Sequence, residues 1–143
     1  TRSTLESVYR SLTFEEIKPL LPAIVEAIKT PSPSGIMFAG EIRLSGLELL
    51  AKYRIQEGMP LCIDVLEINK WGKSRRITKS LEILATYGGA ARPMLPQLLQ
   101  LKKDLLAHSE ARMLKPRVDQ LTKLIQDIEN AKTVPKLRSI KQL

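Results

Sequence analysis

A repeat with a period of 34 to 38 residues is the feature that most limits what this 143-residue chain can fold into. Residues 46–53 (GLELLAKY) and 80–87 (SLEILATY) are identical at five of eight positions, and a sixth position pairs Leu with Ile. Pro22, Pro60 and Pro96 recur at intervals of 38 and 36 residues, each at or near the start of an apolar segment. Proline favours the first turn of a helix, where its missing N–H is not needed. The period is therefore typical of stacked helix pairs, an α-solenoid.

Apolar residues follow helical spacing along most of the chain. Within residues 56–69, one set falls at i, i+3, i+4 and i+7, the spacing of one helical face: Met59, Cys62, Ile63 and Leu66. No long stretch alternates apolar and polar residues as a half-buried strand does. We therefore predict an all-α fold, a right-handed α-α superhelix of about three helix pairs with a terminal capping helix at residues 4–11.

The predicted helices form three repeats within a single domain, residues 1–143. The repeats are expected at about residues 13–54, 55–88 and 89–131, followed by a basic tail at 132–143. The helices within them pair 14–29 with 37–54, 57–69 with 74–87, and 93–107 with 110–131.

Residues 87–101 (YGGAARPMLPQLLQL) resemble the repeat core of bacterial HEAT or armadillo-like proteins. In those repeats a helix ends at Gly, an Ala-rich turn follows, and Pro opens the next helix. The resemblance covers residues 13–131 and implies a helical-repeat fold without a catalytic residue set. Residues 47–108 are also similar to C-terminal repeats of larger uncharacterised bacterial proteins. Because the chain begins with Thr1 and not with an initiator methionine, we expect it to be a processed chain or part of a longer protein.

Positive charge is concentrated in two short segments. The formal net charge is +8, and residues 70–79 (KWGKSRRITK), here called the basic corner, contain five basic and no acidic residues. The tail at 132–143 adds four basic residues, so the remainder of the chain is nearly neutral. We expect the tail to be a solvated end. The candidate partner-binding residues are those of the basic corner: Trp71, Lys73, Arg75, Arg76 and Lys79. Trp71 has an alternative role, that of covering the edge of a neighbouring repeat.

Two functions fit the basic corner. A nucleic-acid track on a solenoid needs basic residues at equivalent positions of successive repeats. The repeat alignment instead places Lys79 in one row with Ser45 and Asp119, a mixture that favours ion pairs between repeats. We therefore favour a non-catalytic protein-interaction or scaffold module, which binds a protein partner or supports an adjoining domain. Binding of nucleic acid or another polyanion through residues 70–79 is the alternative.

The chain has few residues suited to catalysis or cofactor binding. His108 is the only histidine and Cys62 the only cysteine, so zinc-type ligand spacing is absent. His108 is expected to cap a helix end, and Cys62 to be a buried hydrophobe. Gly88 and Gly89 do not belong to a phosphate-binding motif. We expect no enzyme activity, no cofactor, no metal and no small-molecule substrate. The longest apolar run is far below the roughly 20 residues that span a bilayer, so we expect a soluble chain without a membrane partner.

Local sequence signals give further expectations. Thr13 opens the pattern T-x-x-E of a helix-capping box. In the basic corner, Gly72 is expected to permit a chain reversal and Ser74 to cap the next helix, with the charges facing water. Tyr53 and Tyr87 share one repeat position, which favours core packing or a hydrogen bond at a helix end.

Overall fold

The computed structural model of the chain describes residues 13–29 and 37–142. Its elements follow in the order α2 (Phe14–Ile17), the 3-10 helix η1 (Lys18–Leu20), α3 (Leu21–Lys29), α4 (Met37–Lys52), α5 (Gly58–Asp64), α6 (Lys73–Ala85), the 3-10 helix η2 (Gly88–Met94), α7 (Leu95–Leu106), α8 (Ala111–Glu129) and the 3-10 helix η3 (Ile140–Gln142). These two ranges contain no β-strand, so the prediction of an all-α fold is confirmed for them. None of their helices is both long enough and apolar enough to cross a bilayer. The capping helix predicted at 4–11 lies outside the described residues.

Prolines divide two of the predicted helices. The helix expected at 14–29 consists of α2, η1 and α3, because Pro19 lies in the 3-10 segment. Proline lacks the N–H of the regular i→i−4 bond, which favours a tighter local turn. Pro93 lies within η2 in the same way, so the helix expected from residue 93 becomes α-helical only at Leu95.

Two helix ends show how local residues set the boundaries. The predicted capping box is confirmed: the Glu16 N–H donates to Thr13 Oγ1 at 3.3 Å, and the Thr13 N–H donates to Glu16 Oε1 at 3.1 Å. Helix α5 ends at Asp64, five residues before its predicted end. Glu67 has a φ of 45°, in the left-handed region, and a regular helix cannot continue through that conformation.

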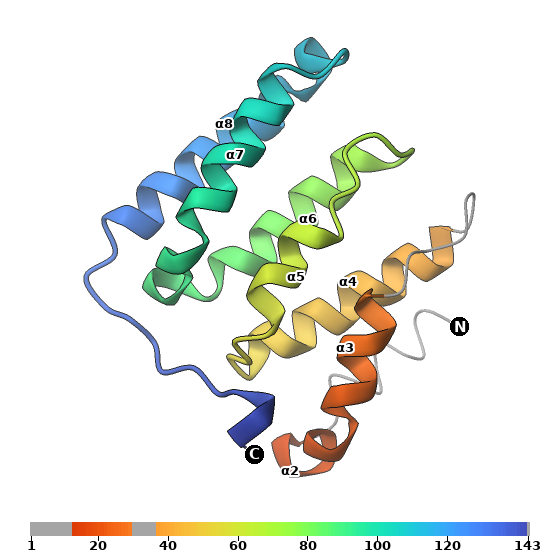
Figure 1. Cartoon of the computed structure of the whole chain (residues 1–143), viewed down its shortest axis with the longest axis vertical. Helices are drawn as coiled ribbons and strands as arrows, with labels where there is room; N and C mark the ends of the chain where they lie inside the picture. Colours follow the sequence, from red (N-terminus) through yellow and green to blue (C-terminus); the bar gives the residue numbers. More distant parts are fainter. Residues whose placement is uncertain (1–12, 30–36, 143) are drawn as a thin grey trace.

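Consecutive helices pack as pairs, and the pairs lie side by side (Figure 1). Helix α3 contacts α4, α5 contacts α6, and α7 contacts α8. Helix α6 also contacts both α4 and α8, so it is the middle member of a layer of three helices. The α5–α6 and α7–α8 loops lie at the same end of the molecule in Figure 1. This shared end includes the basic corner.

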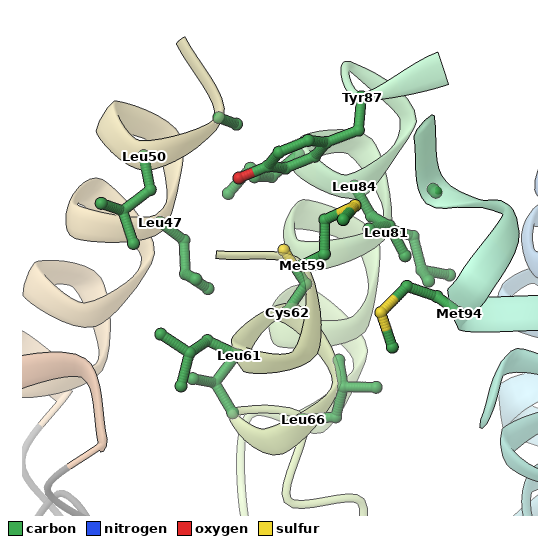
Figure 2. Close-up of a cluster of buried hydrophobic side chains, with 14 of the residues drawn as sticks. Leu47, Leu50, Met59, Leu61, Cys62, Leu66, Leu81, Leu84, Tyr87 and Met94 are labelled. Carbon is green, nitrogen blue, oxygen red and sulfur yellow. The ribbon is translucent and has the colours of Figure 1, made fainter. Parts of the chain in front are cut away.

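One continuous apolar core joins the helix pairs, and Tyr87 lies within it (Figure 2). The Tyr87 ring is fully buried, and its hydroxyl donates to the carbonyl of Ile55 at 2.8 Å. Core packing and a hydrogen bond thus occur together, as the repeat position of this tyrosine predicted. Cys62 is also buried in this cluster, as expected, and burial raises the pKa of its thiol to about 12.

The C-terminal segment is not a simple solvated end, which corrects the expectation for the basic tail. After α8 it passes η2 and reaches the α4–α5 connection, where the Arg138 N–H donates to the Arg54 carbonyl at 2.9 Å. Gln56 N–H donates back to the Arg138 carbonyl at 2.8 Å. Ser139 is buried, and its hydroxyl donates to Glu57 Oε2 at 2.8 Å. The segment therefore ties the last helix to the first described pair.

Candidate partner-binding surface

The basic corner begins with a chain reversal at Gly72. This residue has a φ of 80°, a left-handed conformation that glycine adopts without steric cost, as predicted. Gly72 is also the N-cap of α6, which begins at Lys73. The prediction that Ser74 caps this helix is wrong, because Ser74 already lies in the first turn. Its carbonyl accepts a 2.9 Å hydrogen bond from Thr78 Oγ1.

Arg76 points into the α5–α6 loop rather than into solvent. Its Nε donates to the Leu66 carbonyl at 3.0 Å, and Nη2 donates to the carbonyls of Glu67 at 2.8 Å and Lys70 at 2.9 Å. Nη1 donates to the Trp71 carbonyl. Burial lowers the pKa of Arg76, although the nearby Glu67 charge opposes that shift. One guanidinium thus bonds four carbonyls of the loop backbone, and the expectation that this charge faces water is corrected.

Lys73 and His108 join the α5–α6 loop to the α7–α8 loop. Lys73 Nζ lies 2.7 Å from Glu110 Oε1, and the lysine side chain is only 12% exposed. The hydrogen bond and charge of Lys73 lower the pKa of Glu110. His108 Nδ1 accepts from the Glu110 N–H at 2.9 Å, which leaves Nε2 as the donor to the Ile68 carbonyl at 2.9 Å. His108 thus bonds to a neighbouring loop, not to the end of its own helix as expected.

A buried ion pair joins the same loop to the first helix pair. Arg43 of α4 is buried, with Nη1 2.5 Å from Glu67 Oε1 and Nε donating to the Ile28 carbonyl at 2.8 Å. Lys70 bonds to the other oxygen of Glu67. Burial alone would raise the pKa of Glu67, but hydrogen bonds and charge from Lys70 and Arg43 lower it overall. Sequence reasoning missed this cluster, although an arginine within the apolar segment 42–51 was a usable signal.

Three of the five candidate residues remain on the surface. Trp71 is 75% exposed, so it does not cover a neighbouring repeat edge. Arg75 and Lys79 are exposed on α6. Lys79 lies 3.8 Å from Glu82 on its own helix, and Lys115 lies 3.3 Å from Asp119 on α8. These pairs form within helices, whereas the repeat alignment had favoured pairs between repeats.

A groove lies between the first two turns of α6 and the first two turns of α8. Its volume is about 330 Å³, and its walls are Ser74, Arg75, Thr78, Lys79, Met113, Pro116 and Arg117. We call it the α6–α8 groove. It contains three cationic side chains and no carboxylate. Sequence reasoning placed Arg75 and Lys79 in the candidate site but missed Met113 and Arg117, because the repeat alignment set Lys115 beside Arg75 and Asp119 beside Lys79 instead.

Side chains in the described part of the chain do not form a cluster of three or more His, Cys, Asp or Glu suited to a metal ion. The chain matches no family model, no curated protein and no solved structure. The resemblance of residues 87–101 to HEAT or armadillo-like repeats therefore stays a prediction.

Proposed function

We propose that this chain is a non-catalytic scaffold or protein-interaction module built as a HEAT/armadillo-like α-solenoid. The observation that carries the proposal is a set of ion pairs that join each helix pair to the next. Arg43 with Glu67 joins the first pair to the second, and Lys73 with Glu110 joins the second to the third. Bonds of this kind fix the orientation of successive repeats, as a rigid binding or spacing surface requires.

The proposal of a non-catalytic module is supported by the burial or hydrogen bonding of three side chains that could take part in catalysis: His108, Cys62 and Tyr87. Both ring nitrogens of His108 are hydrogen-bonded to neighbouring loop atoms. Burial raises the pKa of Cys62 to about 12, which keeps the sulfur as a thiol at neutral pH, whereas a nucleophile needs thiolate. The Tyr87 hydroxyl is buried and bonded to a backbone carbonyl. These groups stabilise the fold and leave the surface for recognition.

Nucleic-acid binding is the weaker alternative. Of the five cations in the basic corner, Lys70, Lys73 and Arg76 are bonded within the protein. Arg75 and Lys79 are exposed, and two exposed cations are too few for a long phosphate track. We expect weak association with nucleic acid that disappears as salt is raised.

Cross-linking in the native host, followed by mass spectrometry, tests the proposed function. Lysines of this chain should form reproducible cross-links to one protein partner or to one adjoining domain, and nuclease treatment should leave these cross-links unchanged. Cross-links that vanish with nuclease, together with tight nucleic-acid binding in gel shifts at physiological salt, would establish the alternative instead.

A further inference from the structure

Residues 137–142, here called the tail segment, lie along the α4–α5 connection in the way that an added strand pairs with a sheet edge (Figure 1). Ile55 and Arg138 form a parallel β-bridge. Within it the Arg138 N–H donates to the Arg54 carbonyl at 2.9 Å, and the Gln56 N–H donates to the Arg138 carbonyl at 2.8 Å. These bonds use backbone groups alone, so any extended segment can form them.

Side chains add specificity to this backbone pairing. Glu57 accepts the Ser139 hydroxyl at 2.8 Å and the Ile140 N–H at 3.1 Å. The Arg138 guanidinium lies 4.1 Å from the centre of the Phe14 ring, a cation–π contact. Two aliphatic side chains of the tail segment pack half-buried against the core: Leu137 and Ile140. We call the surface formed by Phe14 and residues 54–57 the tail site.

The tail segment is attached separately from the chain that precedes it. Arg92 Nη2 donates to the Ala131 carbonyl, and the Thr133 carbonyl lies against η2. Lys136 is exposed between these contacts and the tail site. The tail segment can therefore open at the end of the chain while residues 131–135 stay on η2.

The backbone of the tail site has an uncommon conformation at the residue that accepts the tail segment. Arg54 has a φ of 55°, in the left-handed region that residues other than glycine rarely adopt and that is often found where a ligand is held. Release of the tail segment opens three polar groups in the order acceptor, donor, acceptor: the Arg54 carbonyl, the Gln56 N–H and the Glu57 carboxylate. This order matches the backbone groups of one extended segment.

We propose that the tail site recognises an extended segment of a protein partner, and that the tail segment occupies the site until the partner segment displaces it. The tail segment defines the chemistry that the site accepts: a basic residue followed by a hydroxyl residue, between two aliphatic side chains. A carboxylate at the hydroxyl position is rejected, because it would lie beside Glu57. This inference rests on the proposed interaction function and names the chemistry of the partner.

A protein partner is favoured over a second copy of this chain as the source of the segment. Two copies that exchange tail segments form the same bonds as before and lose the entropy of association. A partner segment gains from contacts that its parent protein makes elsewhere on the module. Such contacts are needed, because a tethered tail segment competes at a high effective concentration. An isolated peptide should therefore bind the unmodified chain only weakly.

Fluorescence anisotropy with a labelled peptide of residues 134–142 tests this proposal on the full-length chain. Ser139→Asp places a carboxylate beside Glu57, and Arg138→Pro removes the N–H that bonds Arg54, so each change should release the tail segment. Both variants should then bind the peptide at least about tenfold more tightly than the unmodified chain. Peptides with Asp in place of Ser139, or with the same residues in scrambled order, should bind these variants at least about tenfold more weakly.

The matched control is Thr133→Asp, which makes the same change in net charge as Ser139→Asp at an exposed position outside the tail segment. This control should bind the peptide as weakly as the unmodified chain does. Phe14→Leu, added to Ser139→Asp, should weaken peptide binding about threefold, because the contact between the arginine and the ring is lost.

Hydrogen exchange at the Gln56 amide reports whether the tail segment has left its site. If exchange is unchanged in both releasing variants, the tail segment cannot be displaced and the proposal fails. If exchange rises but the peptide does not bind, the site does not recognise a separate segment and the proposal also fails. Dimers of the unmodified chain that disappear with Ser139→Asp would assign the site to a second copy instead. In each of these cases the module function stands if cross-linking finds a protein partner on another surface, and it fails if cross-linking finds none.

Discussion

The Tyr87 hydroxyl donates a 2.8 Å hydrogen bond to the Ile55 carbonyl, and both residues are fully buried. The bond joins the end of α6 to the connection between α4 and α5. Gly58 lies against it, because a Cβ at that position would stand 2.4 Å from the Tyr87 oxygen. The Tyr87 hydroxyl can therefore keep this position only if residue 58 has no side chain.

This dependence predicts the result of a double-mutant cycle. Tyr87→Phe should lower the free energy of unfolding by about 1 kcal/mol, because the Ile55 carbonyl keeps its bond from the Gly58 N–H. Gly58→Ala should cost about 2 kcal/mol in the native background, and about 1 kcal/mol less when Tyr87 is already Phe. Urea denaturation of the four proteins gives the coupling energy. Strictly additive effects would show that the close approach is not energetically important.

The two cations that bond Glu67 should differ in their effect on stability. The Arg43 side chain is 9% exposed, whereas that of Lys70 is 58% exposed. Arg43→Met removes the buried donors to Glu67 Oε1 and to the Ile28 carbonyl and leaves Lys70 as the cation beside Glu67, so it should lower the free energy of unfolding by about 2–4 kcal/mol. Lys70→Met should lower it by less than about 1 kcal/mol. Denaturant midpoints of the two variants provide the measurement, and similar losses would contradict the difference in burial.

The lowered pKa of Glu67 predicts a loss of stability in acid. A carboxyl whose pKa is depressed in the folded state stabilises the protein above its unfolded pKa, near 4.5, and loses this effect as pH falls through the folded pKa. The free energy of unfolding should therefore decrease below about pH 4.5. Glu67→Gln should be less stable at neutral pH and should show a shallower decrease. Parallel pH curves for the two proteins would contradict this role of Glu67.

Arg76 and Lys79 should separate into a structural and a binding role. Arg76→Ala removes the donors for four loop carbonyls and should lower the free energy of unfolding by about 2 kcal/mol. Lys79→Ala should change it by less than about 0.5 kcal/mol. Thermal melts and limited proteolysis of the α5–α6 loop measure the difference. If the Arg76→Ala protein were as stable and as protease-resistant as the unmodified protein, Arg76 would not have the predicted structural role.

The difference between Arg76 and Lys79 also shows which features could be predicted from the sequence. The repeat at 46–53 and 80–87 predicted the helices, because periodic apolar residues determine which faces become buried. It could not predict the bonds of Arg76 or Arg43, since these depend on the backbone of the 65–72 loop and on residues far apart in the chain. Charge alone grouped Arg76 with Lys79, whereas their contacts differ. Arg117 entered the candidate site only once α8 was placed beside α6.

The C-terminal segment gives a last prediction, because it closes a long-range connection to the first described helices. Ser139 Oγ donates to Glu57 at 2.8 Å, the Ile140 N–H donates to the same carboxylate at 3.1 Å, and the Arg138 guanidinium lies 4.1 Å from the centre of the Phe14 ring. Ser139→Ala should lower the free energy of unfolding by about 1 kcal/mol, since Glu57 keeps its bond to the backbone. Removal of residues 132–143 should cost more, because the backbone bonds and the contact with Phe14 are lost together. Hydrogen exchange should then increase at Gln56, whose N–H donates to the Arg138 carbonyl in the intact chain. Unchanged exchange at this amide after truncation would show that the segment adds no stability to the α4–α5 connection.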